Sequence, residues 1–195
     1  MNYPNGKKNK QGKQKSPQSN QKYSNRGMTL EEDINTTNSY YLDIGKANIH
    51  KKPTPVQIVK VNYPKRSAAV ITEGYFKQAS TTDYNGIYRH KYIDFEAKET
   101  KNKTLLPLAN IHDHQIRHME SIIHHGGICF LIIRFSSFDE TYFMDTKILF
   151  PYWHEKLNGG RKSIPYEIIK QKGYLIPFQY QARVDYLTII DKLYF

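Results

Sequence analysis

The spacing of hydrophobic residues divides the chain into an opening helix, a set of strands and a mixed second half. Over residues 29–42 the apolar positions recur at helical spacing, and Thr29 followed three residues later by Glu32 is typical of a capping box. β-Branched residues dominate 56–63, and a second apolar run follows over 68–76. These two runs predict a long β-hairpin that projects from the rest of the chain.

The second half of the chain alternates strands with helices. Clean alternation of apolar and polar side chains over 91–98 indicates the clearest strand in the sequence. The further elements that we expect are helices over 109–125 and 184–193, strands over 128–134 and 141–145, and a short helix that Ser163 caps and that carries Pro165 in its first turn. This order predicts an α/β fold in which helices flank a mixed sheet.

One face of the strand over 91–98 carries Asp94, Glu96 and Lys98, and neighbours on that face lie about 7 Å apart. The opposite face is apolar. If this strand lies at the edge of a sheet, ordinary alternation with a solvated polar face is the simpler explanation.

An acid upstream favours a functional explanation. Asp83 lies just before Asn85-Gly86, a pair typical of a tight hairpin turn, and such a turn returns Asp83 to the side of the following strand. Asp83 and Glu96 then converge on one hard cation, and Mg²⁺ prefers oxygen ligands of this kind. We therefore predict a phosphodiester-cleaving site, in which Lys98 positions the attacking water or neutralises charge on phosphorus.

The charge of the chain indicates the partner of this site. The 195 residues include 29 Lys and Arg against 18 Asp and Glu, a formal net charge of +11 that favours a polyanion. Cys129 is the single cysteine, which suits a reducing compartment. The sequence has neither a secretory signal nor an apolar stretch of the ~20 residues that a membrane span requires. We therefore expect a cytoplasmic protein that binds DNA and no membrane.

The chain divides into an arm and one domain. Residues 1–22 carry several lysines, no acid and little apolar surface, so we expect a disordered basic arm. The arm either lies on DNA or is an inert solvated tail. Residues 23–195 are expected to form one nuclease domain, with the hairpin as a stalk at about 55–76.

Longer strings of sequence are more specific than the acids alone. Asp83 with Glu96-Ala97-Lys98 resembles the motif of the PD-(D/E)xK nuclease superfamily. From about Tyr23 to the C-terminus the chain resembles the RecU family of bacterial Holliday junction resolvases. The strings that carry this resemblance are 23–33, 50–61, 63–70, 80–86 and 92–100.

The resemblance implies a restriction-endonuclease-like core and a homodimer that makes one nick in each of two opposed strands of a four-way junction. It implies Mg²⁺, with Mn²⁺ as a substitute, and Lys98 as the stabiliser of the transition state. The metal ligands that it implies are Thr81, Asp83, Glu96 and Gln115. By periodicity, Gln115 is equally a solvated helix residue, and Thr82 or a backbone carbonyl fills the place of Thr81 equally well.

The stalk of this family enters the centre of the junction and reads its shape. The residues that we expect at DNA are Arg26, Lys51, Lys60, Lys65, Arg66 and Phe76. A solvated surface cation is the common alternative for any single Lys or Arg. The resemblance also suggests contacts with the RecA recombinase and with the branch-migration helicase.

Two other classes of protein stay open. One is a non-catalytic module that binds DNA junctions and regulates a recombinase, and the other is a restriction-type nuclease that cuts duplex at a specific sequence. The intact acids and Lys98 favour catalysis, and the stalk disfavours the restriction enzyme. The histidines lack a His-Glu-x-x-His pattern, so we interpret His114 and His118 as solvated helix residues and not as zinc ligands. Glu32 is interpreted as a cap in preference to an acid near the metal.

Overall fold

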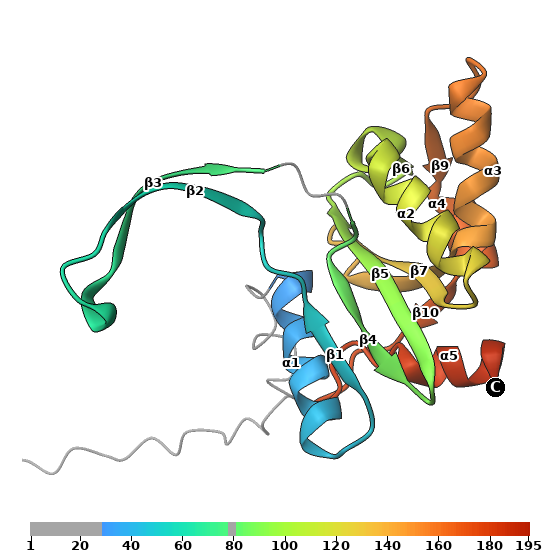
Figure 1. Cartoon of the computed structure of the whole chain (residues 1–195). Coiled ribbons are helices and arrows are strands. Elements are labelled where there is room, and N and C mark those ends of the chain that lie inside the picture. The colour runs from blue at the N-terminus through green and yellow to red at the C-terminus, as the bar shows by residue number, and fades with distance from the viewer. Residues whose placement is uncertain (1–28, 78–80) are drawn as a thin grey trace, which may run out of the picture.

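Six strands form one mixed sheet, in the order β1-β4-β5-β7-β8-β10, in the computed structural model, which describes residues 29–77 and 81–195 (Figure 1). Their bounds are Asn48–Lys51 for β1, Tyr84–Tyr88 for β4, Lys91–Thr100 for β5, Ile128–Phe135 for β7, Glu140–Asp145 for β8 and Tyr174–Ile176 for β10. β5 and β7 pair in parallel, and the other neighbouring strands of the sheet pair in antiparallel. A parallel pair needs a crossover connection, which helix α2 (Asp113–His124) supplies.

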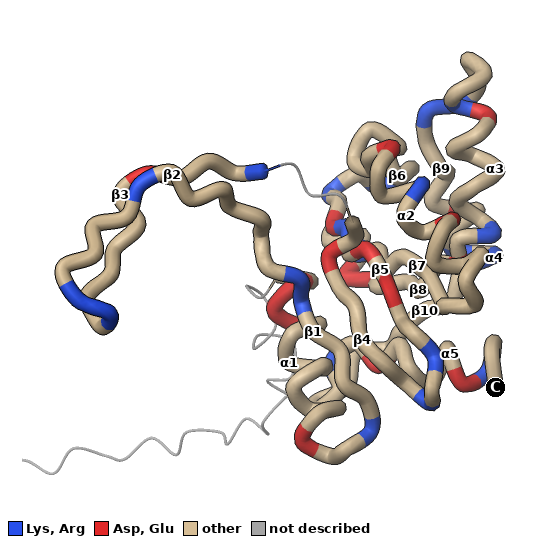
Figure 2. The backbone as a smooth tube through the Cα atoms, viewed as in Figure 1, with Lys and Arg blue, Asp and Glu red and all other residues tan. Residues whose placement is uncertain are grey.

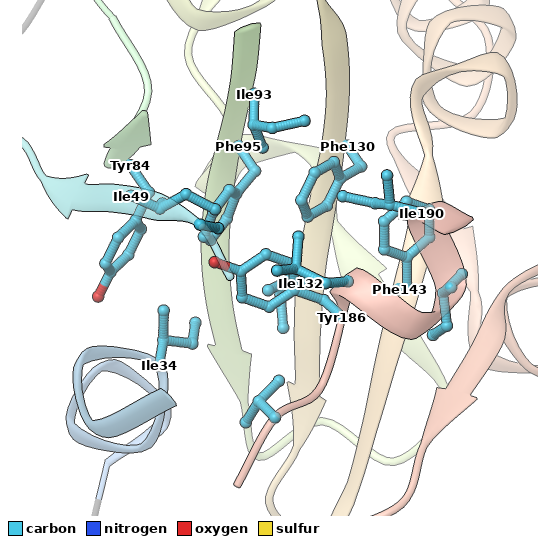
Figure 3. Close-up of a cluster of buried hydrophobic side chains, with 14 of the residues drawn as sticks. Ile34, Ile49, Tyr84, Ile93, Phe95, Phe130, Ile132, Phe143, Tyr186 and Ile190 are labelled. Atoms are coloured by element: carbon cyan, nitrogen blue, oxygen red, sulfur yellow. The ribbon is translucent and has the colours of Figure 1, made fainter. Parts of the chain in front are cut away.

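Helices cover both faces of this sheet and enclose two hydrophobic cores. Helices α1 (Leu30–Asp43) and α5 (Leu187–Tyr194) cover the first core, in which the rings of Phe95, Phe130 and Phe143 stack in a row (Figure 3). Helices α2, α3 (Thr146–Leu157) and α4 (Tyr166–Lys172) cover the second. Every residue of β7 is buried, in agreement with the apolar run over 128–133. The predicted α/β architecture, a mixed sheet flanked by helices, is confirmed.

The predicted stalk is a two-stranded antiparallel ribbon outside the main sheet. Strands β2 (Val56–Asn62) and β3 (Val70–Phe76) run away from the domain and are joined through the 3₁₀ turn Arg66–Ala68 (Figure 1). Every residue of both strands is exposed. The hairpin is therefore confirmed, and the second strand begins two residues later than the pattern predicts because the 3₁₀ turn occupies the tip.

The opening helix and its cap are also confirmed. The Thr29 hydroxyl accepts a hydrogen bond from the Glu32 amide at 3.2 Å, and the Glu32 carboxylate accepts one from the Thr29 amide at 2.7 Å. Both bonds of a capping box are present, so the cap explains Glu32 fully. The arm predicted over 1–22 lies outside the described residues.

Three element predictions are wrong at their starts. The helix expected from 109 begins at Asp113, because the residues before it form strand β6 (Leu105–Pro107) and the 3₁₀ turn Leu108–Asn110. The helix expected from Ser163 is instead strand β9 (Ser163–Pro165), which pairs with β6, and α4 starts after it with Pro165 as its N-cap. The last helix begins at Leu187 and not at 184, because Val184 forms a bridge with Phe178.

Helix α3 was not predicted, because Pro151 lies inside it and removes one backbone donor from the helical ladder. The Asp145 carboxylate caps the helix by accepting a hydrogen bond from the Lys147 amide at 2.8 Å. Trp153 is buried in the second core. Among the described residues, no helix combines the length and the apolar character needed to cross a membrane.

Candidate active site

The hairpin of β4 and β5 brings Asp83 beside Glu96, but it turns at Arg89 and His90. Both residues have positive φ, 46° and 62°, as a tight two-residue hairpin turn requires. The turn predicted at Asn85-Gly86 is wrong, because both residues lie within β4. The predicted convergence survives because the register of the strands, with Tyr84 opposite Phe95, places the residue before Tyr84 beside Glu96.

Gly86 has a different task from the one that its sequence suggests. It faces Ile49 of the edge strand β1, and a β-carbon at this position would lie 2.1 Å from the Asn48 carbonyl oxygen. No side chain fits at that distance. Gly86 therefore permits the close approach of β1, the strand that leads into the stalk.

Asp83, Glu96 and Lys98 form a connected group on the face of the sheet that α2 covers. The Asp83 amide donates a hydrogen bond to Glu96 Oε2 at 3.1 Å, and the Ala97 amide donates one to Asp83 Oδ2 at 3.3 Å. The Lys98 ammonium lies 2.5 Å from Glu96 Oε1, and its side chain keeps 20% of its exposure. The fold thus brings together the three residues that the sequence predicts at the centre of the site.

Glu96 is an unusual carboxylate. Its side chain is 0% exposed, so the strand is not an edge strand with a solvated polar face. Burial, followed by the nearby charge of Asp83, raises the pKa of Glu96 to about 7, and Lys98 opposes this increase. Lys98 contacts Glu96 Oε1, yet no donor among the described residues reaches that oxygen in hydrogen-bonding geometry.

This environment fits a bound cation. Two carboxylates converge, and the repulsion between them, which helps to raise the pKa of Glu96, is what a positive ion relieves. Within the part of the chain that the structure describes, no three His, Cys, Asp or Glu side chains gather as a metal site. Two carboxylates are nevertheless enough for Mg²⁺, which usually keeps several waters and takes few protein ligands.

The other two implied metal ligands differ in their surroundings. Gln115 is only 5% exposed, which excludes the solvated alternative, and its side-chain oxygen accepts a hydrogen bond from the His112 amide at 3.0 Å. It lies one helical turn before His118, which contacts β5, so Gln115 is on the face of α2 that is turned toward the sheet. The Thr81 hydroxyl donates to the Thr82 carbonyl at 3.4 Å.

Beside this group, Asp94 forms a buried network that sequence reasoning missed. Its carboxylate is fully buried and accepts hydrogen bonds from Lys52 Nζ at 2.7 Å, from the Tyr92 hydroxyl at 3.2 Å and from the Thr82 hydroxyl. His118 Nε2 lies 3.2 Å from the same carboxylate. Alternation along the strand predicts the face on which Asp94 lies, but it contains no information about partners from α2 or from the segment that follows β1.

The interpretation of two histidines changes accordingly. The prediction that His118 is a solvated helix residue is wrong, because His118 contacts the buried Asp94. His114 is half-buried, and burial followed by the charge of His112 lowers the pKa of its imidazole. His114 lies one helical turn before His118, which contacts Asp94 of β5. Both residues are therefore on the side of α2 that is turned toward the sheet.

Most of the residues predicted at DNA lie on the stalk, away from the acids. Lys60, Lys65, Arg66 and Phe76 are all exposed there, and Figure 2 shows basic residues along the ribbon and at its tip. Lys51 lies at the end of β1 and forms an exposed ion pair with Glu31 of α1. Arg26 lies outside the described residues. The structure therefore separates a basic, aromatic ribbon from an acidic centre.

Comparisons with known proteins identify the family of the chain. Residues 25–192 match the model of the RecU family, described as recombination protein U. Curated relatives named Holliday junction resolvase RecU include one from Oceanobacillus iheyensis, 65% identical over 196 residues and covering 100% of both chains. Relatives with the same name from Geobacillus kaustophilus and Bacillus cereus are 60% and 56% identical, and each match covers 100% of this chain and 98% of the relative.

Among solved structures, an archaeal Holliday junction resolvase, Hjc of Archaeoglobus fulgidus, aligns with a TM-score of 0.40 and 8% identity, over 70% of this chain and 89% of that one. This likeness is too distant to bear on the site. The family model and the long relatives are sufficient by themselves: the chain belongs to the RecU family, whose curated relatives are named Holliday junction resolvases.

Proposed function

We propose that this chain is a Mg²⁺-dependent endonuclease that resolves four-way DNA junctions by paired nicks, working as a homodimer. The observation that carries the proposal is the convergence of Asp83 and Glu96 beside Lys98 on one face of a buried strand. A protein that only binds junctions needs no buried pair of carboxylates. The names of the relatives support the same reaction.

Each residue of this group has a distinct task in the proposed reaction. Asp83 and Glu96 would hold the metal ion, and the buried amide oxygen of Gln115 is a third candidate for that task. When bound, Mg²⁺ activates a water molecule for attack and stabilises the leaving oxygen. The Lys98 ammonium is partly exposed at the end of the acid pair, where it neutralises charge that develops on a phosphate.

The same lysine also limits repulsion before any DNA arrives. Its contact with Glu96 opposes the increase in the pKa of that carboxyl, so more of the ligand is ionised near neutral pH. Metal binding requires the ionised form of a carboxylate ligand. Lys98 thus helps to keep the acid pair ready for a cation.

The stalk supports selectivity for junctions and the homodimer. Its exposed residues include Val56, Ile58, Val59, Val61, Val70, Ile71, Tyr75 and Phe76, which are 41% to 83% exposed. A two-stranded ribbon is marginally stable alone in water, and exposed apolar residues in this number are typical of an interaction surface. A second copy of the ribbon covers apolar residues of this kind, while Lys65 and Arg66 at the tip remain available to phosphates.

The proposed cellular setting follows from the reaction. A protein that resolves chromosomal junctions works in the cytoplasm of a bacterium. Contacts with the RecA recombinase and with the branch-migration helicase stay predictions of the family resemblance. So does the place of Thr81 among the metal ligands.

A cleavage assay with single-residue variants tests the proposal. We expect the full-length protein with Mg²⁺ or Mn²⁺ to cut a synthetic four-way junction and to leave linear duplex of the same sequence intact. Asp83→Asn, Glu96→Gln and Lys98→Met should each slow single-turnover cleavage by about 10²-fold or more, because each removes stabilisation at the reacting phosphate. Junction binding in Ca²⁺ should remain.

A cruciform plasmid tests the paired nicks. Two coordinated nicks convert the plasmid directly to the linear form, whereas independent nicks accumulate open circles first. Glu155→Gln removes an exposed carboxylate from α3 and is the matched control, expected to cut like the wild-type protein. Unchanged cutting by Glu96→Gln, or cutting without a divalent ion, would contradict the proposed site; junction binding without any cutting would favour the regulatory binding module.

A further inference from the structure

We propose that Asp94 and Lys52 are positioning residues, which fasten both ends of the stalk to the strand of Glu96 and thereby hold the metal-binding acids in register. This inference rests on the proposed function, and it concerns residues to which neither the sequence pattern nor the proposed reaction gives a task. It is carried by contacts between segments far apart in the sequence.

The stalk leaves and rejoins the domain at the same place. On the outgoing side, Lys52 follows β1 directly and stands four residues before β2. On the returning side, Thr82 stands two residues before β4. The side chains of both residues donate hydrogen bonds to Asp94, Lys52 Nζ at 2.7 Å to Oδ2 and the Thr82 hydroxyl to Oδ1. One carboxylate therefore fastens the two ends of the ribbon.

Lys52 and Thr82 are also linked to each other. Lys52 Nζ donates to the Thr82 hydroxyl at 3.0 Å, and the Lys52 amide donates to the Asp83 carbonyl at 2.8 Å. The second bond fixes the backbone of the residue whose carboxylate faces Glu96. Lys52 thus acts on Asp83 directly through the main chain and again through Thr82.

Asp94 connects the segments of Lys52 and Thr82 to helix α2. It is two residues before Glu96 on the same face of β5, and its carboxylate also contacts His118 of α2, the helix that carries Gln115. Tyr92 donates to the same carboxylate and accepts a hydrogen bond from Asn85 of β4 at 2.9 Å. The three elements that hold the proposed metal ligands therefore meet at Asp94.

Burial makes the charges of Asp94 and Lys52 depend on each other. The Asp94 side chain is 0% exposed and that of Lys52 is 18% exposed, so neither charge finds full hydration if the other is removed. Without the ammonium, the carboxylate no longer holds the outgoing chain, and Asp83 loses one constraint on its distance from Glu96. Mutation of residues that support metal ligands in this way typically lowers metal affinity by about 10- to 100-fold.

The experiment compares metal binding, junction binding and cleavage in the full-length protein. For Lys52→Met and Asp94→Asn we expect the affinity for Mn²⁺, measured by calorimetry without DNA, to fall ~10-fold or more. Single-turnover cleavage at a fixed Mn²⁺ concentration should slow in parallel, and higher Mn²⁺ should recover part of the rate. Junction affinity in Ca²⁺ should change little, because the stalk surface is untouched.

A matched control separates positioning from stability. Arg134→Met breaks another buried ion pair, with Asp33 at 2.7 Å, on the opposite face of the sheet. It should lower the resistance to urea as much as Lys52→Met does and leave Mn²⁺ affinity unchanged. Equal losses of Mn²⁺ affinity in both variants, or wild-type affinity in Lys52→Met, would overturn the proposal.

Chemical restoration provides a second test. In Lys52→Cys, aminoethylation of the new thiol rebuilds an ammonium of lysine length, and the one native cysteine, Cys129, is buried. The treated variant should regain Mn²⁺ affinity, and treated wild-type protein should not change. If Lys52→Met does not fold, Tyr92→Phe, which removes only the hydroxyl that donates to Asp94 at 3.2 Å, should also lower Mn²⁺ affinity. Failure of the proposed function appears elsewhere, as undiminished cutting by Glu96→Gln.

Discussion

Glu96 shows how much the chemistry of one residue depends on its place in the fold. A glutamate two residues before a lysine is common on solvated strands, where neither charge is perturbed. Here the strand is buried on both faces, Asp83 lies beside it, and the pKa of Glu96 increases to about 7. The sequence motif supplies the groups, and burial gives them properties that suit metal binding.

Gly86 provides a prediction at the same scale. In Gly86→Ala the new methyl would lie 2.1 Å from the Asn48 carbonyl and 2.5 Å from the Ile49 α-carbon, so β1 has to move. We expect a loss of about 1–3 kcal/mol in the free energy of unfolding, measured with urea, as is typical of overpacking. Because β1 leads to Lys52, Mn²⁺ affinity should decrease as well. Ser39→Ala, at an exposed position of α1, is the control. A stability equal to wild type in Gly86→Ala would show that β1 is not held this closely.

At the scale of elements, β5 is the organising strand of the domain. One face of it packs Ile93 and Phe95 into the first core, and the other buries Asp94 and Glu96. Its neighbours are an antiparallel hairpin partner on one side and a parallel strand on the other. The parallel pairing requires the crossover through α2, and this crossover places Gln115 and His118 over the acids. The position of the site in the sheet is thus a consequence of strand order.

The contact between β8 and α4 gives a prediction on pH. Glu140 of β8 accepts hydrogen bonds from the hydroxyls of Tyr142 and Tyr166, each at 2.6 Å, and these bonds hold the pKa of its carboxyl below its usual range. A lowered pKa in the folded state means that the stabilisation is complete above the unfolded pKa, near 4.5, and is lost as pH falls through the folded value.

The measurement is urea unfolding of the wild-type protein and Glu140→Gln between pH 3 and pH 7. The difference between their free energies of unfolding should be constant at neutral pH and should shrink as pH falls below 4.5, the ordinary pKa of the carboxyl. Glu167→Gln, which removes an exposed carboxylate of α4, is the matched control. A difference that grows toward low pH would contradict the sign of the shift.

For the whole molecule, the important division is between the stalk and the domain. No described stalk residue belongs to either hydrophobic core, so the ribbon adds little to the packing that stabilises the domain. The ribbon closes where the Lys77 amide donates to the Pro55 carbonyl at 2.9 Å, so its two ends lie next to each other. The exposed basic ribbon and the buried acids are therefore on separate parts of one chain.

This division predicts the effect of removing the ribbon. Replacement of residues 56–76 by a short Gly-Ser turn should leave the urea midpoint and Mn²⁺ affinity close to wild type. The preference for a junction over duplex should be lost, and the apparent mass in sedimentation should shift toward the monomer if the apolar ribbon holds the proposed dimer. Lys65→Ala with Arg66→Ala is the matched control: it should weaken junction binding and keep the mass. An unfolded product of the replacement would contradict the independence of the domain.

How much of the fold and of the site could be predicted depended on the distance between interacting residues along the chain. The helix cap of Thr29 and Glu32, the alternation along β5 and the hairpin stalk were all predicted correctly, because each depends on neighbours in sequence. The start of α2, the interior of α3 and the turn at Arg89-His90 were not. In each of these, tertiary packing outweighed local preference, as with the proline that α3 accommodates.

The sequence by itself determined which groups are available: two acids and a lysine on a strand, a basic and aromatic hairpin, and an excess of positive charge. Only the tertiary structure decided their environment and partners. It buried Glu96, brought Asp83 beside it through an unforeseen turn, and joined Lys52 to Asp94 across 42 positions. The physical reason is that local periodicity depends on residues a few positions apart, whereas burial and ion pairing depend on which distant segments the sheet places side by side.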